Sequence, residues 1–463
     1  MDNRILDFLT LLKGKKIALI GIGRSNVPLI SLFSSYGANV IACDRRSYEE
    51  LGEFATIAQE SGATLSLGEN YLDDIDVDIV LRTPGMKYYL DSLTKMRNNG
   101  VVVTSEMELF FDLCPCKIIG ITGSDGKTTT TTIISEILKK SGKTVHLGGN
   151  IGKPLLPDIE NINATDIAVV ELSSFQLISM RKSPDISIVT NIEPNHLDIH
   201  KDMQEYVDSK KNVIAHQNAF SKAVLNLDNT LSNSFSEDVR GELRKFSRKS
   251  EVFNGWYLDG ENIVYSEFGN KTTIMSIKDI KIPGMHNVEN FMTAISAVWG
   301  LVDIQDIVHV AKNFCGVAHR AEFVRELNGV RFYNDSIASS PTRTACGTLS
   351  LYDEKILLIC GGYDKNLDYT DLGSLICKKV KHLILLGATA DKIETAVKNS
   401  ADFADCGINI VRVGSMEEAV KKSSELAVDG DIVSMSPASA SFDMYKDFEQ
   451  RGNHFKQLVN ELK

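Results

Sequence analysis

Glycine, lysine and threonine residues gather in the stretch KIIGITGSDGKTTTTTI, which spans residues 117–133. Its glycines stand at positions 120, 123 and 126, directly before Lys127 and Thr128. The common phosphate-binding pattern G-x-x-x-x-G-K-[ST] also needs a glycine six residues before the lysine, where this chain has Ile121. The stretch therefore predicts either a variant phosphate loop or a glycine-rich turn with a solvated lysine.

The residues around this loop favour the phosphate interpretation. KIIGIT is an apolar run typical of a buried strand, and KTTTTTIISEILKK has the apolar spacing of a helix. A strand, a glycine loop and a helix together point backbone N–H groups and the helix dipole at an anion. In such a loop Lys127 would reach the β- and γ-phosphates, and the Thr128 hydroxyl would bind Mg²⁺.

Composition excludes several classes of function. The 463 residues predict roughly three domains at about 150 residues each. The formal charge of −11 argues against general affinity for nucleic acid or anionic membranes. The chain starts without a secretory pattern, and no run of about 18 apolar residues predicts a membrane span. Eight scattered cysteines are typical of reduced thiols, so we expect a cytoplasmic protein without membrane insertion.

Strands and helices are expected to alternate along the whole chain, which predicts an α/β protein with mainly parallel sheets. Three regions repeat this alternation, and we place their boundaries at residues 1–113, 114–316 and 317–463. Within the second region, FNGWYLDGENIVYS predicts a hairpin whose tight turn contains Asp259 and Gly260.

The first region also contains a partial dinucleotide fingerprint. ALIGIGRSN is followed by NVIACD, which ends at Asp44, about twenty residues beyond the first glycine. Asn26 replaces the third glycine of that pattern. From the pattern alone, an NAD site and a purely structural turn remain equally open.

Beyond these stretches, an ordered series of motifs resembles the Mur ligases, which form amide bonds with ATP during peptidoglycan precursor synthesis. The loop GITGSDGKTTT resembles the short G-T-N-G-K-[ST] loop of that family. The resemblance continues through GGNIG (148–152), ELSSFQL (171–177), NIEPNHLDIH (191–200), YVDSK (206–210), GMHNVEN (284–290), AHRAE (318–322), YNDS (333–336), GGYDK (361–365) and SPASASFDMYKDFEQRG (436–452). ELSSFQL and the last segment most resemble members that add D-glutamate to UDP-N-acetylmuramoyl-L-alanine.

The resemblance implies a fold and a reaction. It implies a Rossmann-like first domain, a central P-loop ATPase-like domain and a Rossmann-like third domain, in a protein that we expect to be a monomer. The carboxylate of the UDP-linked substrate would attack ATP to give an acyl phosphate, which the amine of D-glutamate then attacks. By the same match, ATP would contact Gly123, Ser124, Asp125, Gly126, Lys127, Thr128, Thr129, Asn287, Asn290, Arg320 and Asp335.

The resemblance also implies two Mg²⁺ ions. Thr128 and Glu171 would hold the first, and His196 would hold the second. The lysine that matches Lys210 is carbamylated in this family, which turns a repelled ammonium into oxygen ligands that suit Mg²⁺. Lys211 is a competing candidate, but the spacing of YVDSK favours Lys210. Lys127, His196 and Lys210 are the implied catalytic residues.

The remaining contacts implied by the match belong to the other two substrates. The UDP-linked substrate would contact Gly23, Arg24, Ser25, Asp44, Arg45, Arg46, Thr83, Pro84, Gly85, Asn150, Ser173 and Gln176. D-Glutamate would contact Ser339, Lys365, Ser441 and the backbone near Phe448. One position departs from the family, because Ile337 stands where many members have lysine. A neighbouring basic group is then expected to replace that cation.

Three other functions compete with this interpretation. Folylpolyglutamate synthase shares the loop and the acyl-phosphate chemistry, but its relatives generally lack a first region of this kind. A nucleotide-operated switch would hydrolyse ATP without an acceptor. An NAD-dependent oxidoreductase would use the fingerprint in the first region.

Overall fold

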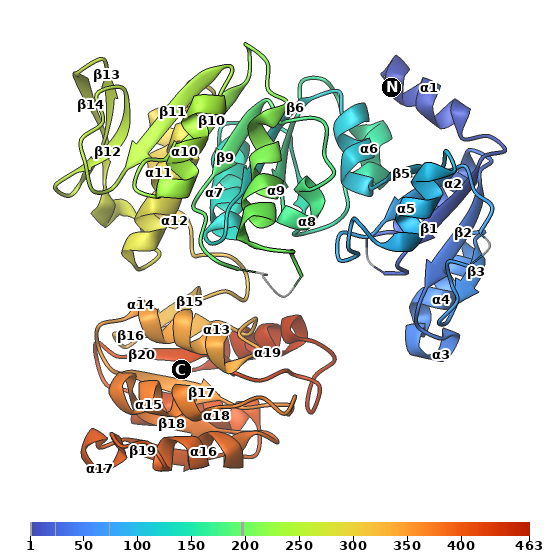
Figure 1. Ribbon diagram of the computed structural model, residues 1–463. Coiled ribbons are helices and arrows are strands. Elements are labelled where there is room, and N and C mark those ends of the chain that lie inside the picture. Colours follow the sequence, from blue (N-terminus) through green and yellow to red (C-terminus); the bar gives the residue numbers. More distant parts are fainter. Residues whose placement is uncertain (1, 24, 74, 196–198) are drawn as a thin grey trace. The chain divides into compact units, whose positions relative to one another are not determined.

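The computed structural model describes residues 2–23, 25–73, 75–195 and 199–463. These residues form three β-sheets with helices between their strands, as expected for an α/β protein (Figure 1). By density of internal contacts they divide into two compact units, residues 1–279 with 288–311, and residues 280–287 with 312–463. The boundaries at residues 113 and 316 remain predictions. No helix among the described residues is both long and apolar enough to cross a membrane.

The first sheet is fully parallel, with the strand order β3-β2-β1-β4-β5. Because the chain moves outward from β1 on one side and then returns to β4 on the other, a crevice opens beyond the carboxyl ends of these two strands. The elements are α1 (Asn3–Leu11), β1 (Lys16–Ile20), α2 (Val27–Ser35), β2 (Asn39–Asp44), α3 (Tyr48–Leu51), α4 (Glu53–Glu60), β3 (Thr64–Leu67), β4 (Ile79–Arg82), α5 (Asp91–Asn98), β5 (Val102–Thr104) and α6 (Glu106–Leu113).

The second sheet has the order β14-β13-β12-β11-β10-β9-β6-β8-β7. Strand β6 lies between β8 and β9, so its carboxyl end is again the point where the strand order reverses. The elements up to residue 226 are β6 (Lys117–Thr122), α7 (Lys127–Lys140), β7 (Val145–Gly149), η1 (Leu156–Asn161), β8 (Ile167–Glu171), α8 (Ser174–Leu177), β9 (Ile186–Val189), α9 (Met203–Ala215) and β10 (Lys222–Asn226).

An antiparallel ribbon extends the far edge of this sheet. Asp259 pairs with Asn262 and Gly260 has a φ of 59°, which confirms the predicted hairpin. The elements here are α10 (Thr230–Ser234), η2 (Phe235–Asp238), β11 (Glu242–Ser247), β12 (Gly255–Asp259), β13 (Asn262–Glu267), β14 (Asn270–Ser276), η3 (Ile277–Asp279), α11 (Met285–Val298) and α12 (Ile304–Asn313).

The third sheet has the order β15-β16-β20-β17-β18-β19 and is parallel except for β15. Strand β17 is buried along its whole length, as an apolar run covered on both faces should be. The elements are β15 (Glu322–Leu327), β16 (Val330–Asn334), α13 (Pro341–Cys346), α14 (Thr348–Leu351), β17 (Ile356–Cys360), α15 (Thr370–Lys379), β18 (Val380–Leu385), α16 (Ala390–Lys398), α17 (Phe403–Cys406), β19 (Asn409–Arg412), α18 (Met416–Leu426), β20 (Ile432–Met435) and α19 (Phe448–Glu461).

Candidate functional site

The glycine loop joins β6 to α7, which confirms the predicted order of strand, loop and helix. Gly126 caps α7 in the left-handed region, with a φ of 78°. A Cβ atom at Gly123 would lie 1.9 Å from the Thr190 hydroxyl oxygen, and one at Gly126 would lie 2.4 Å from the Asn290 side-chain oxygen. Only glycine fits at either position, so these glycines are structural requirements of this loop.

The segment after β9 fixes the conformation of the loop. The backbone N–H of Ser124 donates to Asn191 O at 2.8 Å, and that of Asp125 donates to the Asn191 side chain at 2.9 Å. The Ser124 hydroxyl donates to Glu193 O at 2.9 Å, and the Thr190 hydroxyl donates to Asp125 O at 2.6 Å. These bonds hold the loop in place before any ligand binds.

Lys127 and Thr128 lie at the first turn of α7. The Lys127 ammonium donates to Gly123 O at 2.9 Å and to Ser124 O at 2.8 Å, which folds it over the loop. Thr128 donates its hydroxyl to Glu171 Oε2 at 2.7 Å, and Asn150 donates its amide to Glu171 Oε1 at 2.8 Å. The structure therefore brings together four residues that the sequence assigned to the ATP, metal and substrate sites.

The pair Thr128–Glu171 fits a magnesium ion. Glu171 ends β8, is only 1% exposed, and offers carboxylate oxygens beside a hydroxyl at a helix N-terminus. Hard oxygen donors of this kind are what Mg²⁺ selects. Among the described residues, no three His, Cys, Asp or Glu side chains gather as a ready-made metal site, either here or elsewhere. His196 lies outside the described residues.

Lys210 faces the glycine loop from α9. Its side chain is buried, and its Nζ donates to Gly123 O at 2.7 Å. Burial lowers the pKa of Lys210 to about 7, and the positive charge of Lys127 acts in the same direction. Lys211, the next residue, instead forms an ion pair with Asp238 at 2.7 Å.

Two further predicted substrate residues lie just after β8. Ser173 and Gln176 form a capping box at α8, in which the Ser173 N–H and hydroxyl each donate to Gln176 Oε1 at 2.9 Å. His200, which sequence reasoning did not single out, packs its ring on Phe175 with a centroid distance of 5.0 Å. These contacts keep α8 in a fixed conformation near Glu171.

The predicted UDP-contacting residues of the first sheet line one cavity. A cavity of about 570 Å³ is bordered by Gly23, Ser25, Asp44, Arg45, Arg46, Thr83 and Gly85, together with Tyr71 and Met86. Pro84 belongs to the same turn, and Arg24 lies outside the described residues. The predicted UDP-contacting residues of this region span 63 positions of the sequence, from residue 23 to residue 85, and the fold places most of them around one cavity.

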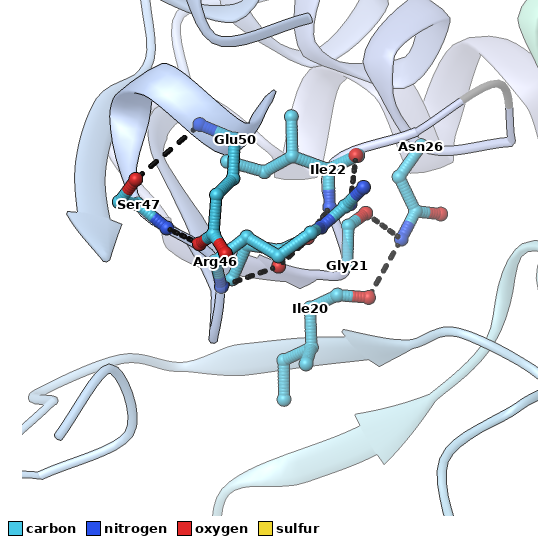
Figure 2. A network of polar contacts seen from close by, with 8 residues as sticks. Ile20, Gly21, Ile22, Asn26, Arg46, Ser47 and Glu50 are labelled. Atoms are coloured by element: carbon cyan, nitrogen blue, oxygen red, sulfur yellow. Dashed lines mark hydrogen bonds and ion pairs between the residues drawn. The ribbon is translucent and has the colours of Figure 1, made fainter. Parts of the chain in front are cut away.

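Figure 2 shows how the turn after β1 is held. Asn26 donates its amide to Ile20 O at 2.9 Å and to Gly21 O at 3.1 Å, and Arg46 donates to Ile22 O at 2.8 Å. Asn26 thus stabilises the turn where the dinucleotide fingerprint would have a glycine.

Asp44 has no remaining capacity for a ribose. Its carboxylate accepts from the Ile22 N–H at 2.8 Å and from Arg46 through its backbone N–H, Nε and Nη2 at 2.8–3.0 Å. Burial opposes ionisation, but the hydrogen bonds from Arg46 and Ile22 outweigh it and lower the pKa of Asp44. Four donors fill the roughly four lone-pair sites of a carboxylate, so Asp44 is unsuited to the ribose-binding role of an NAD site, and in this conformation it would border a uridine without accepting a further hydrogen bond from it.

A buried arginine that sequence reasoning missed joins the first and second sheets. Arg82 ends β4, is 1% exposed, and donates to Phe175 O at 3.0 Å and to the Ser179 hydroxyl at 2.7 Å. Ser179 in turn donates to Glu108 at 3.0 Å. The signal was a single charged residue inside the apolar run DIVLRTPG, directly before Thr83.

In the second compact unit, Asp335 is buried and accepts three hydrogen bonds. Thr348 donates at 2.7 Å, Ser436 at 3.0 Å and the Ala321 N–H at 3.2 Å. Burial raises the pKa of Asp335 to about 6. Arg320, its predicted companion at the ATP site, is exposed at the turn before β15.

Asn287 and Asn290, also predicted at the ATP site, both lie on α11. The Asn287 amide donates to Pro283 O at 2.6 Å. Asn290 accepts from the Thr130 hydroxyl at 3.3 Å, which puts it beside the first turns of α7. Asn290 is therefore next to the glycine loop.

The four predicted D-glutamate residues lie on segments that are hydrogen-bonded to one another, and we call them the acceptor cluster: Ser339, Lys365, Ser441 and Phe448. Arg451 links these segments by donating to Ser336 O at 2.9 Å, to Ser439 O at 3.1 Å and to Ala440 O at 2.9 Å. The Ser336 hydroxyl donates to Phe448 O at 2.8 Å, and the Tyr363 N–H donates to Ala440 O at 2.9 Å.

Arg451 is a second residue that sequence analysis did not assign. It is 1% exposed, and burial lowers its pKa to about 10. Its only sequence signal was its place in the motif DFEQRG.

Three α/β sheets, with a glycine loop at the reversal point of the second one, define a phosphate-loop protein with one further α/β domain before this sheet in the chain and another after it. Comparison with known families gives a closer assignment. Residues 121–298 match the Mur ligase middle domain, and residues 319–439 match the Mur ligase glutamate ligase domain. The chain belongs to the Mur ligase family.

Named relatives align along the entire chain. It is 49% identical over 467 residues to the UDP-N-acetylmuramoylalanine–D-glutamate ligase of Acetivibrio thermocellus, with both chains fully covered. It is 46% identical to the ligase of the same name from Clostridium botulinum strain 657, again with both chains fully covered.

Solved structures agree on the fold. The UDP-N-acetylmuramate-alanine ligase of Thermotoga maritima superposes with a TM-score of 0.57 at 17% identity, over 97% of this chain and 100% of that one. A UDP-N-acetylmuramoyl-L-alanyl-D-glutamate–2,6-diaminopimelate ligase gives the same TM-score at 18% identity, over 92% of each chain.

Proposed function

We propose that this protein is an ATP-dependent amide ligase that adds D-glutamate to UDP-N-acetylmuramoyl-L-alanine in peptidoglycan precursor synthesis. The observation that carries the proposal is the 49% identity along the whole chain to a ligase of that name. The glycine loop supports the ATP-dependent chemistry, because the Lys127 ammonium is hydrogen-bonded over the loop and the Thr128 hydroxyl is hydrogen-bonded to Glu171.

The reaction we infer has two steps. A carboxylate oxygen of the UDP-linked substrate attacks the γ-phosphorus of ATP, the bond to the β-phosphate oxygen breaks, and ADP and an acyl phosphate form. The neutral amine of D-glutamate then attacks the acyl carbon, loses a proton, and expels phosphate to leave the amide.

The first step must overcome repulsion between two anions. At about 4 Å this repulsion is roughly 4 kcal/mol per pair of unit charges for an effective dielectric constant near 20. Lys127 and the backbone N–H groups at the start of α7 are this chain's own contribution to offsetting it. Magnesium held by Thr128 and Glu171 would supply further positive charge when bound.

We infer that Lys210 is carbamylated in the working enzyme. Its neutral amine would attack CO₂ and lose a proton, so the side-chain charge changes from +1 to −1. A pKa near 7 makes this feasible, because about half of the side chains are then neutral at pH 7. At the ordinary value of 10.5, only about one lysine in three thousand would be neutral at that pH.

Several finer assignments belong to the same proposal. The second Mg²⁺ at His196 and the ATP contacts of Asn287, Asn290, Arg320 and Asp335 are supported by the motif match. The UDP contacts are supported by that match and by the 570 Å³ cavity that most of those residues line. A cytoplasmic location and a monomeric state also remain predictions.

An acceptor screen tests the proposal directly. The purified protein is given ATP, Mg²⁺ and the UDP-linked substrate with single amino acids, and the release of ADP and amide product is measured. We expect release that needs both the UDP-linked substrate and D-glutamate. Hydrolysis of ATP without an acceptor would favour a switch, and glutamylation of a folate would favour folylpolyglutamate synthase.

Replacing Lys365 by alanine should weaken the acceptor site selectively. Lys365 is exposed in the acceptor cluster, and its Nζ lies 5.9 Å from the Phe442 ring centroid. Loss of a cation that binds a carboxylate should raise the KM for D-glutamate about 10-fold or more while the KM for ATP stays within about twofold. Lys398→Ala is the matched control, because Lys398 is exposed on α16 and paired with Glu394. A larger rise in the KM for ATP would remove Lys365 from the acceptor site.

A further inference from the structure

Arg343 is held beside the turn that carries Ser339. Its Nη1 donates to Ile337 O at 3.3 Å, and the backbone N–H of Ser339 donates to the same oxygen at 2.8 Å. The guanidinium is therefore close to a predicted D-glutamate residue. Arg343 is also hydrogen-bonded directly to Ile337, the position for which the sequence predicts that a neighbouring basic group replaces the family's lysine.

The helix that carries Arg343 is anchored to the acceptor cluster by the next residue. Thr344 is fully buried, and its hydroxyl lies 3.0 Å from that of Ser436. Ser436 begins the segment that leads to Ser441. Because α13 is fixed on this side, the exposed Arg343 side chain extends from a rigid base toward solvent.

Two cations in and beside the cluster have no ion-pair partner among the described residues. Among the described residues, neither Arg343 nor Lys365 forms an ion pair with a carboxylate. The acidic residues nearby are engaged elsewhere: Asp364 pairs with Lys392, Asp335 accepts from Thr348 and Ser436, and Asp443 accepts the Ala388 N–H. Arg343 and Lys365 thus have no direct carboxylate partner among the described residues, in a chain whose net charge is −11.

We propose that Arg343 binds one of the two carboxylates of the acceptor amino acid and makes the enzyme selective for a dicarboxylate. This inference rests on the proposed function. Two cations complement two carboxylates, and the planar guanidinium can still offer paired N–H donors while Nη1 remains on Ile337 O. The cation that takes the place of the family's lysine at position 337 is therefore Arg343, which lies six residues further along the chain on α13.

The test compares three acceptors with the wild type and Arg343→Ala. D-Glutamate has both carboxylates, D-glutamine lacks the side-chain carboxylate, and D-isoglutamine lacks the α-carboxylate. For Arg343→Ala we expect the KM for D-glutamate to rise about 10- to 100-fold, with kcat within about threefold and the KM for ATP unchanged. The preference for D-glutamate over one of the two amides should fall by a similar factor. If that amide is D-glutamine, Arg343 binds the side-chain carboxylate; if it is D-isoglutamine, Arg343 binds the α-carboxylate.

Two further variants separate recognition from folding. Arg343→Lys keeps the positive charge but lacks the paired N–H donors of the guanidinium, so it should give a KM for D-glutamate between those of the wild type and Arg343→Ala. The double variant Arg343→Ala with Ile337→Lys places a cation on the turn that precedes α13 and should recover part of the lost preference. Arg412→Ala, an exposed arginine on β19 that pairs with Asp391 and Glu394, serves as the control.

The result that overturns the inference is an Arg343→Ala enzyme whose preferences over both amides stay within about twofold of the wild type. The proposed function has its own readout, because the wild type must join D-glutamate in the same assay. A wild type without that activity refutes the function, whereas an active wild type with an unaffected variant refutes only the role of Arg343.

Discussion

Replacing Lys127 by alanine is expected to lower the rate of ligation by about 1,000-fold or more. The ammonium is held by two carbonyl oxygens of the glycine loop, at 2.9 and 2.8 Å, so it is already positioned at the start of α7. A preorganised charge of this kind stabilises the transferring phosphoryl group without reorganisation, and alanine removes it entirely. The measurement is the rate of ADP release with all three substrates at saturation.

Lys139→Ala is the matched control for this prediction. Lys139 lies on the same helix, is exposed, and pairs with Glu136 at 2.9 Å. We expect the control to keep wild-type turnover and both proteins to show similar melting temperatures. If Lys127→Ala turned over within about tenfold of the wild type, the glycine loop could not be the triphosphate site.

Replacing Lys210 by alanine should leave about 1% of activity or less, and short-chain carboxylic acids such as acetate should restore part of it. The substitution removes a buried side chain whose Nζ lies 2.7 Å from Gly123 O. A small carboxylate can then enter the vacated space and supply the oxygen atoms that a carbamate would have supplied. Turnover is measured against acetate concentration.

The adjacent residue gives the control. Lys211 is paired with Asp238, so Lys211→Ala should keep its turnover and should not respond to acetate. A fully active Lys210→Ala enzyme, or equal stimulation of both variants by acetate, would exclude the carbamate.

The pH dependence of the same chemistry follows from the lowered pKa of Lys210. Only the neutral amine attacks CO₂, and a pKa of about 7 means that the neutral fraction rises from about a tenth at pH 6 to about nine tenths at pH 8. After CO₂ is stripped from the wild type, the rate of reactivation at constant dissolved CO₂ should rise with pH over that window. A rate that keeps rising about tenfold per pH unit beyond pH 8, and levels off only above about pH 10, would indicate an ordinary solvated lysine.

Much of the fold could be predicted because its signals are local. KIIGIT becomes β6 and KTTTTTIISEILKK becomes α7, since each run carries the periodicity of its own element. Glu171 was expected at the end of a strand because the apolar run before it ends there. Lys127 and Thr128 follow from the same loop, where a few consecutive residues determine which groups face an anion.

The contacts of Arg82, Arg343 and Arg451 could not be predicted in this way. Arg82 meets Ser179 across 97 positions, and Arg451 meets Ser336 across 115. No local pattern encodes such pairs, because they form only when separate sheets and loops pack together. Arg343 is six residues from Ile337, but its contact depends on where α13 begins and how the preceding turn folds.

By itself the sequence determined the three α/β regions, the glycine loop and the residue types available for ATP, magnesium and a dicarboxylate. The motif match already favoured Lys210 over Lys211, but the contacts of each lysine came only from the tertiary structure, since one step along a helix rotates a side chain by about 100°. Lys210 lies against Gly123 while Lys211 lies against Asp238. Which side of α9 packs on the sheet is set by the other elements of the fold, and that packing gives one lysine a buried, weakly basic amine and leaves the other an ordinary ion pair.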